Sequence, residues 1–280
     1  MFIFMQDINI STIIGSTVPV EEQLKLIKNA GFDGFFLTYT GIEPLVSWAE
    51  TAYQLGLKFE TIHGPFSQAN RIWEAGDIGK DYLTYLKKII NDCHSVNVDK
   101  LIMHVTVGNT APPISSNGLI LFQELCDYAK EKNVHICFEN LEPLPHIDAV
   151  MDYIKDPFHG FCWDCGHNLC YSPHIDMIKK FGSRLKCLHI HDNLGVTQPG
   201  NIDYRDDRHY LPFDGTLDWN WFVEKLSVLN YTGPITLEVS ILGKSEYQNL
   251  SLTEYLNNAY ERATKLRDML IQKQTSNISL

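Results

Sequence analysis

The sequence contains no apolar stretch of the roughly 18 residues that a membrane-spanning helix requires. Its first residues, 1–7, reach an acid, Asp7, without a preceding basic residue, so we expect no signal peptide there. The same residues fit the start of a first strand. We therefore expect a cytoplasmic protein with no membrane association.

A disulfide framework is also missing. The seven cysteines are an odd number and lack framework spacing, which favours reduced thiols. Cys162 and Cys165 form a C-x-x-C pair, but they flank Asp164 at the end of an apolar run. Packing of two small apolar side chains is the better interpretation than a redox or zinc–thiolate role.

Positive charge is scarce. The 23 lysines and arginines face 34 aspartates and glutamates, which gives a formal net charge of -11. This balance argues against a nucleic-acid partner, although an acidic protein can still carry a local basic groove. The 44% hydrophobic content is typical of a globular protein with a large core.

Short apolar runs alternate about eight times with segments of helical periodicity, and no break in composition separates them. Gly31 and Gly56 end the first two helical segments as C-terminal caps. This pattern predicts a single (β/α)8 TIM barrel over residues 1–280, with a long βα loop at 193–215 over the site and a frayed tail at 272–280. The expected strands are 2–10, 32–39, 58–63, 101–105, 135–141, 160–164, 185–191 and 234–239. The expected helices are 21–30, 43–55, 77–96, 117–132, 147–155, 175–181, 219–229 and 252–271.

Six of the apolar runs end on a residue that binds metals or transfers protons. A parallel barrel assembles its active site from the carboxyl ends of its strands, so these six side chains are expected to meet at one site. They are His63, His104, Glu139, Asp164, His189 and Glu238.

Three of these residues, Glu139, Asp164 and Glu238, are carboxylates at the ends of strongly apolar strands. An unpaired carboxylate there would cost several kcal/mol of desolvation, and the strand ends offer histidines rather than lysines or arginines as partners. Oxygen and imidazole ligands suit Zn²⁺, Mn²⁺ or Co²⁺, and Mg²⁺ also accepts carboxylates. We therefore expect a divalent metal.

Further histidines fall near this edge. His167 follows Asp164 by three residues, and Asp207 and His209 form a D-x-H motif on the long loop. His191 points the same way as His189 only if the strand continues. The remaining histidines lack this context and are treated as ordinary: His94, His135, His146, His159 and His174.

The chain resembles the xylose isomerase-like TIM-barrel superfamily over nearly its full length. The ordered motifs that carry the resemblance are Phe138-Glu139-Asn140, Asp164-Cys165-Gly166-His167, His189-Ile190-His191-Asp192-Asn193, Asp206-Asp207-Arg208-His209 and Leu237-Glu238. In the ketose epimerases of this superfamily, residues matching Glu139, Asp164, His189 and Glu238 hold one metal. The resemblance implies that Glu139 and Glu238 are also the catalytic residues that move protons on and off carbon.

The resemblance extends to endonuclease IV, whose trinuclear zinc site has nine ligands with a match here. Up to three metals therefore stay open, with five residues as additional metal or substrate ligands: His63, His104, His167, Asp207 and His209. Against a DNA substrate, Phe213-Asp214-Gly215 replaces the endonuclease Gly-Glu-Gly, and the loops offer few cations. The candidates for lining a sugar site are Tyr39, Phe66, Trp73 and Arg208, with Phe66 and Trp73 equally compatible with packing of a lid.

Two departures from the ketose epimerases concern substrate contacts. Gly195 stands where they carry an arginine, and Pro145 stands where they carry an acid. The resemblance therefore does not imply that this protein acts on the same sugar as the ketose epimerases. We expect a metal-dependent isomerase or epimerase that acts on a small sugar, sugar phosphate or cyclitol through an enediolate. The alternatives are a multinuclear phosphodiesterase on abasic DNA, a sugar lyase or dehydratase, and a non-catalytic sugar-binding barrel. A homo-oligomer is left open.

Overall fold

The computed structural model describes residues 5–13, 16–108, 110–199 and 202–278. Eight parallel strands follow one another in the order β7-β6-β5-β4-β3-β2-β1-β8. They are β1 (Ile8–Ser11), β2 (Gly34–Thr38), β3 (Lys58–His63), β4 (Lys100–His104), β5 (His135–Glu139), β6 (Gly160–Asp164), β7 (Leu185–His189) and β8 (Ile235–Leu237).

The two ends of this sheet meet immediately beyond β7. The Ile190 amide donates to the Thr236 carbonyl at 3.0 Å, and the Glu238 amide donates to the Ile190 carbonyl at 3.0 Å. This parallel bridge joins β7 to β8, so the sheet forms a nearly closed barrel. The predicted (β/α)8 TIM barrel is confirmed.

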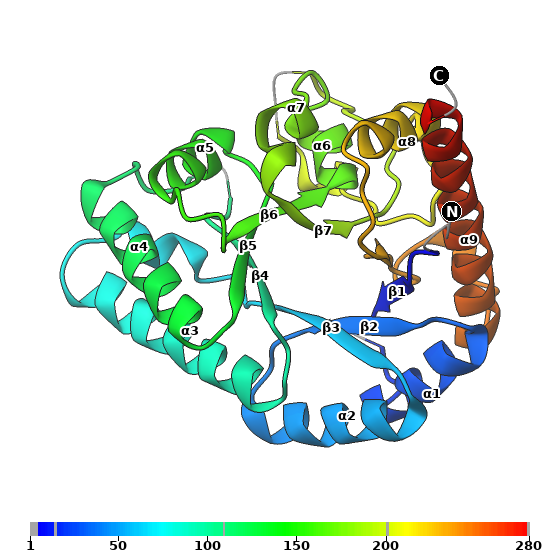
Figure 1. The fold of residues 1–280 in the computed structure, drawn as a ribbon, viewed down its shortest axis with the longest axis horizontal. Coiled ribbons are helices and arrows are strands. Elements are labelled where there is room, and N and C mark those ends of the chain that lie inside the picture. The colour runs from blue at the N-terminus through cyan, green and yellow to red at the C-terminus, as the bar shows by residue number, and fades with distance from the viewer. Residues whose placement is uncertain (1–4, 14–15, 109, 200–201, 279–280) are drawn as a thin grey trace.

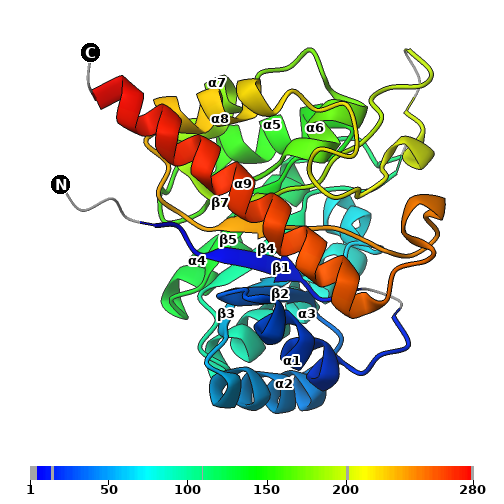
Figure 2. The same ribbon diagram turned by 90° about the vertical axis from the view of Figure 1, so that its right-hand side faces the viewer.

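Helices lie outside the ring of strands (Figure 1). The longest, α9, packs across the outer side of the barrel against α1 and α8 (Figure 2). In the described residues, no helix combines the length and the apolar character needed to span a membrane. The helices are α1 (Val20–Ala30), α2 (Ile42–Leu55), α3 (Asp77–Ser95), α4 (Ser116–Glu131), α5 (Leu144–Tyr153), α6 (Cys165–Tyr171), α7 (Met177–Phe181), α8 (Trp219–Val228) and α9 (Leu252–Ile278), with short 3-10 turns at Ala69–Trp73, Gly182–Arg184, Tyr204–Asp206 and Ser245–Tyr247.

Three segments differ from the sequence expectation. The helix α6 was not expected, and β1 begins at Ile8 rather than at residue 2, with residues 1–4 outside the described part of the chain. The tail expected to fray from residue 272 is helical as far as Ile278. The reason is tertiary, because Gln274 donates to the Tyr231 carbonyl at 2.9 Å and Lys273 pairs with Glu224 of α8.

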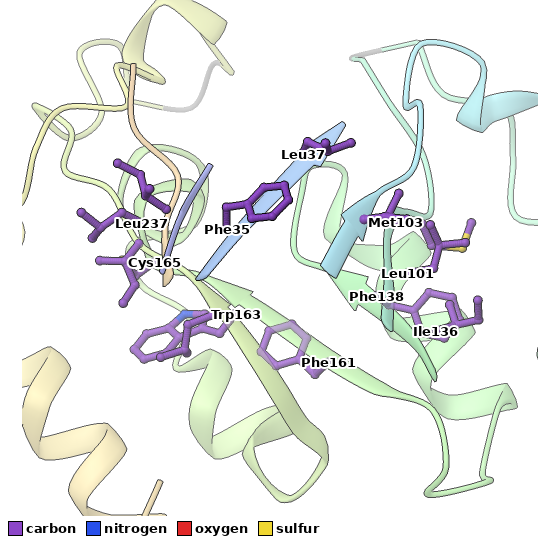
Figure 3. Close-up of a cluster of buried hydrophobic side chains, with 14 of the residues drawn as sticks. Phe35, Leu37, Leu101, Met103, Ile136, Phe138, Phe161, Trp163, Cys165 and Leu237 are labelled. Carbon is purple, nitrogen blue, oxygen red and sulfur yellow. The ribbon is translucent and has the colours of Figure 1, made fainter. Parts of the chain in front are cut away.

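The strands are mostly apolar, as expected of a parallel sheet covered by helices. One set of side chains faces the helices, and Figure 3 shows Leu101, Met103, Ile136, Phe138, Phe161 and Trp163 from this set. A separate cluster of Ile102, Cys137, Cys162 and Cys187 lies in the barrel interior. The interior also holds buried polar side chains, because Asn9 and Thr236 both donate to the Glu60 carboxylate. Cys162 and Cys165 thus belong to different clusters, and all seven cysteines are free and buried, as the packing interpretation requires.

Candidate functional site

The polar site lies directly above the interior layer of the barrel. Side chains alternate along a strand, so the residue two positions beyond an inward-facing one also faces inward. Cys137, Cys162 and Cys187 are therefore followed by inward-facing Glu139, Asp164 and His189. The same step places His104 above Ile102 and Glu238 above Thr236.

Four of these residues form the centre of the site. The candidate ligand atoms of Glu139, Asp164, His189 and Glu238 all lie within 4.8 Å of one another. The His189 Nδ1 atom lies 3.3 Å from Oε2 of Glu139 and 3.3 Å from Oε2 of Glu238. The inward-facing Phe36 stacks on the His189 ring with centroids 4.6 Å apart, which fixes the plane of the imidazole.

His63 and His104 approach the same Glu139 carboxylate. The His63 Nε2 atom lies 3.1 Å from Oε2 of Glu139, and the His104 Nε2 atom lies 3.4 Å from it. The three residues form a further group whose candidate ligand atoms lie within 4.8 Å of one another. These two of the five residues expected as additional ligands are therefore at the site.

A second group is centred on Asp207 of the long loop. His167, His191, Asp207 and His209 bring their candidate ligand atoms within 4.8 Å of one another. The Oδ2 atom of Asp207 lies 3.2 Å from Nε2 of His167 and 3.2 Å from Nε2 of His209. His167 also lies 3.3 Å from Glu139, through Nδ1 and Oε1, which joins this group to the central one.

Three histidines share one arrangement that bears on the bound species. Their Nδ1 atoms lie against backbone carbonyls, 2.7 Å for His63 and Gly64, 3.1 Å for His167 and Asn140, and 2.9 Å for His209 and Glu238. A carbonyl can only accept, so Nδ1 carries the hydrogen and Nε2 is directed at a carboxylate. The lone pair of Nε2 and the carboxylate oxygen repel each other unless a proton or a metal ion lies between them. A backbone carbonyl that accepts the Nδ1 hydrogen is the usual support of a metal-binding histidine.

Local structure explains how two of these groups reach the site. The Asp164 carboxylate caps α6 by accepting the His167 amide at 2.6 Å, so one helical turn aims His167 back at the strand ends. The long loop is held by Asn193, whose Oδ1 accepts the amides of Arg208 and His209. This amide places the D-x-H motif over the barrel.

The electrostatics reflect many imidazoles among few carboxylates. Burial opposes the ionised form of Glu139, but His189 and His104 outweigh it and hold the pKa of this carboxyl well below its usual range. Burial also opposes a charged His209, yet the Asp207 carboxylate raises its pKa to about 9. In His104, burial dominates and lowers the pKa. A metal-free site therefore retains protons on part of its imidazoles.

The expected substrate-lining residues divide into two pairs. The Phe66 ring is 43% exposed and lies 5.2 Å from the ring of His104, and Arg208 is exposed on the loop. Tyr39 and Trp73 are not placed at the site. The Tyr39 hydroxyl donates to Asp92 of α3 at 2.5 Å, and Trp73 Nε1 donates to the Val105 carbonyl at 2.7 Å. Both side chains are buried in the apolar core, Tyr39 directly after β2 and Trp73 at the end of the 3-10 turn Ala69–Trp73.

Sequence reasoning left three buried residues out of the candidate set. They are His191, which joins Asp164 to the second group, and the amides Asn140 and Asn193, which hold Asp164 and the loop. The alternation in His189-Ile190-His191 was the available signal for His191. It depended on the chain staying extended past β7, which the bridge at Ile190 secures.

Comparison with known proteins adds two findings. Residues 24–254 match the family model described as xylose isomerase-like TIM barrel. The chain is also 25% identical over 291 residues to the uncharacterized protein y4fM of Sinorhizobium fredii, an alignment that covers 90% of this chain and 89% of that protein.

Solved structures with this architecture include two sugar epimerases. D-Psicose 3-epimerase from Clostridium cellulolyticum has a TM-score of 0.77 at 13% identity, with 95% of this chain and 99% of that chain covered. L-Ribulose 3-epimerase has a TM-score of 0.75 at 15% identity, with 99% of each chain covered. At these identities the likeness demonstrates the shared fold.

Proposed function

The chain belongs to the xylose isomerase-like TIM-barrel family, and from this premise we propose that it is a divalent-metal-dependent sugar isomerase or epimerase. Its substrate would be a small sugar, sugar phosphate or cyclitol. The observation that carries the proposal is the pair Glu139 and Glu238, whose carboxylates both lie 3.3 Å from one imidazole nitrogen of His189. The sugar epimerases of the same fold support it.

The chemistry of the buried donors fits a metal. In the described part of the chain, Oε1 of Glu139 and both ring nitrogens of His189 are buried without a hydrogen-bond partner. Buried polar atoms are rarely left unpaired, and a cation would satisfy these atoms together. We propose that Glu139, Asp164, His189 and Glu238 hold it. When bound, a divalent ion would polarise a substrate carbonyl and make the adjoining C–H bond more acidic.

The two glutamates then perform the proton transfers. One carboxylate takes the proton from the carbon beside the carbonyl, which leaves an enediolate, and the other returns a proton to the same or the neighbouring carbon. Return to the same carbon from the other side gives an epimer. Return to the neighbouring carbon, with the hydroxyl proton passing to the former carbonyl oxygen, gives an aldose–ketose isomer. Asp164 takes no part in the proton transfers of this scheme, since its carboxylate is held by the His167 amide and by His191.

A multinuclear phosphodiesterase is the second candidate, and the groups around Asp207 and around His63 with His104 favour it. Three metals per chain would fit that activity. The loops argue against a DNA substrate, because two of their few arginines already have partners within the protein. Arg205 is hydrogen-bonded to Asp203 of its own loop, and Arg71 is hydrogen-bonded to Gln68. A lyase or dehydratase would begin with the same proton abstraction and differ only in its product.

The test measures exchange of substrate protons with solvent. Metal-loaded protein in D₂O is incubated with ketoses, ketose phosphates and keto-inositols, and deuterium uptake is followed by NMR. We expect uptake with the wild type and with the exposed control E50Q, and a loss of about 10²-fold or more with E238Q. Elemental analysis gives the number of metals per chain. Undiminished exchange in E238Q would contradict the acid–base role, and abasic-duplex cleavage with three metals would establish the second candidate.

A further inference from the structure

A pocket of about 560 Å³ lies beside the metal-ligand groups, between the start of α5, the end of α6 and the long loop. Its size falls within the range of small-molecule sites. Apolar side chains from three separate segments form most of its lining, among them Leu144, Cys170, Ile175, Val196 and Ile202.

Tyr171 lies at the boundary of this pocket and the site. Its ring lies 5.5 Å from the ring of His167. The same side chain lines the pocket. Cys170, also in the lining, contacts the His167 carbonyl. A ligand held at the histidines would therefore have the pocket as its immediate neighbour.

The charges of the lining disfavour an anion. Of the described residues that line the pocket, none is a lysine or an arginine, His174 contributes an imidazole, and Glu142 contributes a carboxylate. That carboxylate accepts the Leu144 amide at 3.0 Å, so it is fixed at the pocket. Phosphate recognition requires positively charged groups or several amide donors, and a phosphate here would be repelled by Glu142.

We propose that this pocket is a substrate subsite for an uncharged apolar substituent of the sugar, such as an aryl or alkyl group carried by a keto-sugar, whose ketone supplies the carbonyl that the proposed proton transfer needs. The proposal rests on the proposed function, since it assumes that the sugar part lies at Glu139 and Glu238. The proposed subsite narrows the substrate class to sugars with an apolar substituent, and it excludes sugar phosphates from the substrates proposed above. Burial of the substituent against Ile175 and Val196 provides the affinity, and Glu142 provides the discrimination against anions.

The experiment compares three probes in metal-loaded protein by titration calorimetry: phenyl β-D-glucopyranoside, D-glucose and D-glucose 6-phosphate. We expect the phenyl glucoside to bind at least tenfold more tightly than glucose, about 1.4 kcal/mol, and the phosphate to bind no better than glucose. V196D should remove the tenfold preference, and V196F should remove it by filling the pocket. V228D, at a valine that is 66% exposed on α8, is the matched control and should retain it.

Equal affinity for the phenyl glucoside and glucose would overturn the subsite, as would tighter binding of the phosphate or a preference that survives both Val196 variants. Circular dichroism and metal content verify that each variant is folded. Failure of the proposed function has a different signature. In that case the phenyl preference persists, but none of the ketoses, ketose phosphates and keto-inositols of the exchange test exchanges protons with solvent.

Discussion

The His191 Nε2 atom lies 3.0 Å from Oδ1 and 3.1 Å from Oδ2 of Asp164. The His191 ring also stacks on that of His209, with centroids 3.9 Å apart. Gly166 lies directly against the same ring. A Cβ atom added at Gly166 would lie 2.1 Å from an atom of the His191 ring. His191 is thus a buried positioning residue that fixes the orientation of Asp164.

Replacing this imidazole should weaken metal binding without unfolding the protein. In H191Q, Asp164 loses its bidentate partner, and loss of such an outer partner typically reduces metal affinity 10- to 100-fold. The Kd for Zn²⁺ or Mn²⁺, measured by calorimetry, reports the change. The exposed His94 provides the control variant H94Q, which should bind as the wild type does. Unchanged affinity in H191Q would show that Asp164 is held by other contacts.

The contact between Gly166 and His191 should appear as coupling between mutations. G166A places a methyl group against the ring of a buried side chain, which should reduce the free energy of unfolding by about 1–3 kcal/mol. In the H191A background the same change should cost far less, because the ring has been removed. Urea unfolding of the four proteins gives the coupling energy. Additive effects of the two mutations would contradict the contact.

Substitutions at Trp73 and Phe66 should affect different properties, the first the stability of the fold and the second the affinity for sugar. W73F removes the hydrogen bond to the buried Val105 carbonyl, so we expect the free energy of unfolding to fall by about 1 kcal/mol with metal and sugar affinity unchanged. F66A changes a ring that is partly exposed beside His104, so we expect sugar affinity to fall while stability stays within about 0.5 kcal/mol. Denaturant unfolding and calorimetry on both variants provide the comparison. If W73F reduced sugar affinity and F66A reduced stability, Trp73 rather than Phe66 would be assigned to the sugar site.

The metal-free protein should lose stability as the pH rises above neutrality. Burial opposes the charged rings of His189, His167 and His209, but Glu238 with Glu139, and Asp164 with Asp207, outweigh it and raise their pKa values above 6.5. Protons held more tightly by the folded state stabilise it fully below pH 6.5, and this stabilisation is lost as pH rises through the folded pKa, about 9 for His209.

Metal binding needs unprotonated imidazoles, so its stabilising effect should increase over the same interval. Thermal unfolding between pH 6 and 9, with EDTA and with Mn²⁺ or Zn²⁺, measures both trends. The Tm of the EDTA-treated protein should decrease with pH, and the Tm increase produced by metal should grow. H209N should show a smaller decrease in the EDTA series. A Tm of the EDTA-treated protein that rises with pH would contradict the assigned ion pairs.

Much of the barrel could be predicted from local patterns. Apolar runs bounded by glycine-capped helical segments specify parallel strands, and the polar residues at their ends fall at one edge because all eight strands run the same way. The candidate residues Glu139, Asp164, His189 and Glu238 are within reach of this reasoning because side-chain direction along a strand alternates with a period of two. The helical tail could not be predicted in this way, since the last turns of α9 are stabilised by Tyr231 and Glu224, which are distant in sequence.

The sequence by itself determined the strand order, the closed architecture and the identity of the polar residues at the strand ends, because these depend on local periodicity and on the parallel direction of the strands. Only the tertiary structure decided which of those residues meet. The bridge at Ile190 directs His191 inward, α6 returns His167 to Asp207, and Tyr39 and Trp73 are buried in the apolar core. Each of these outcomes depends on the backbone beyond a strand end, where contacts with other elements decide whether the period of two continues and where a side chain points.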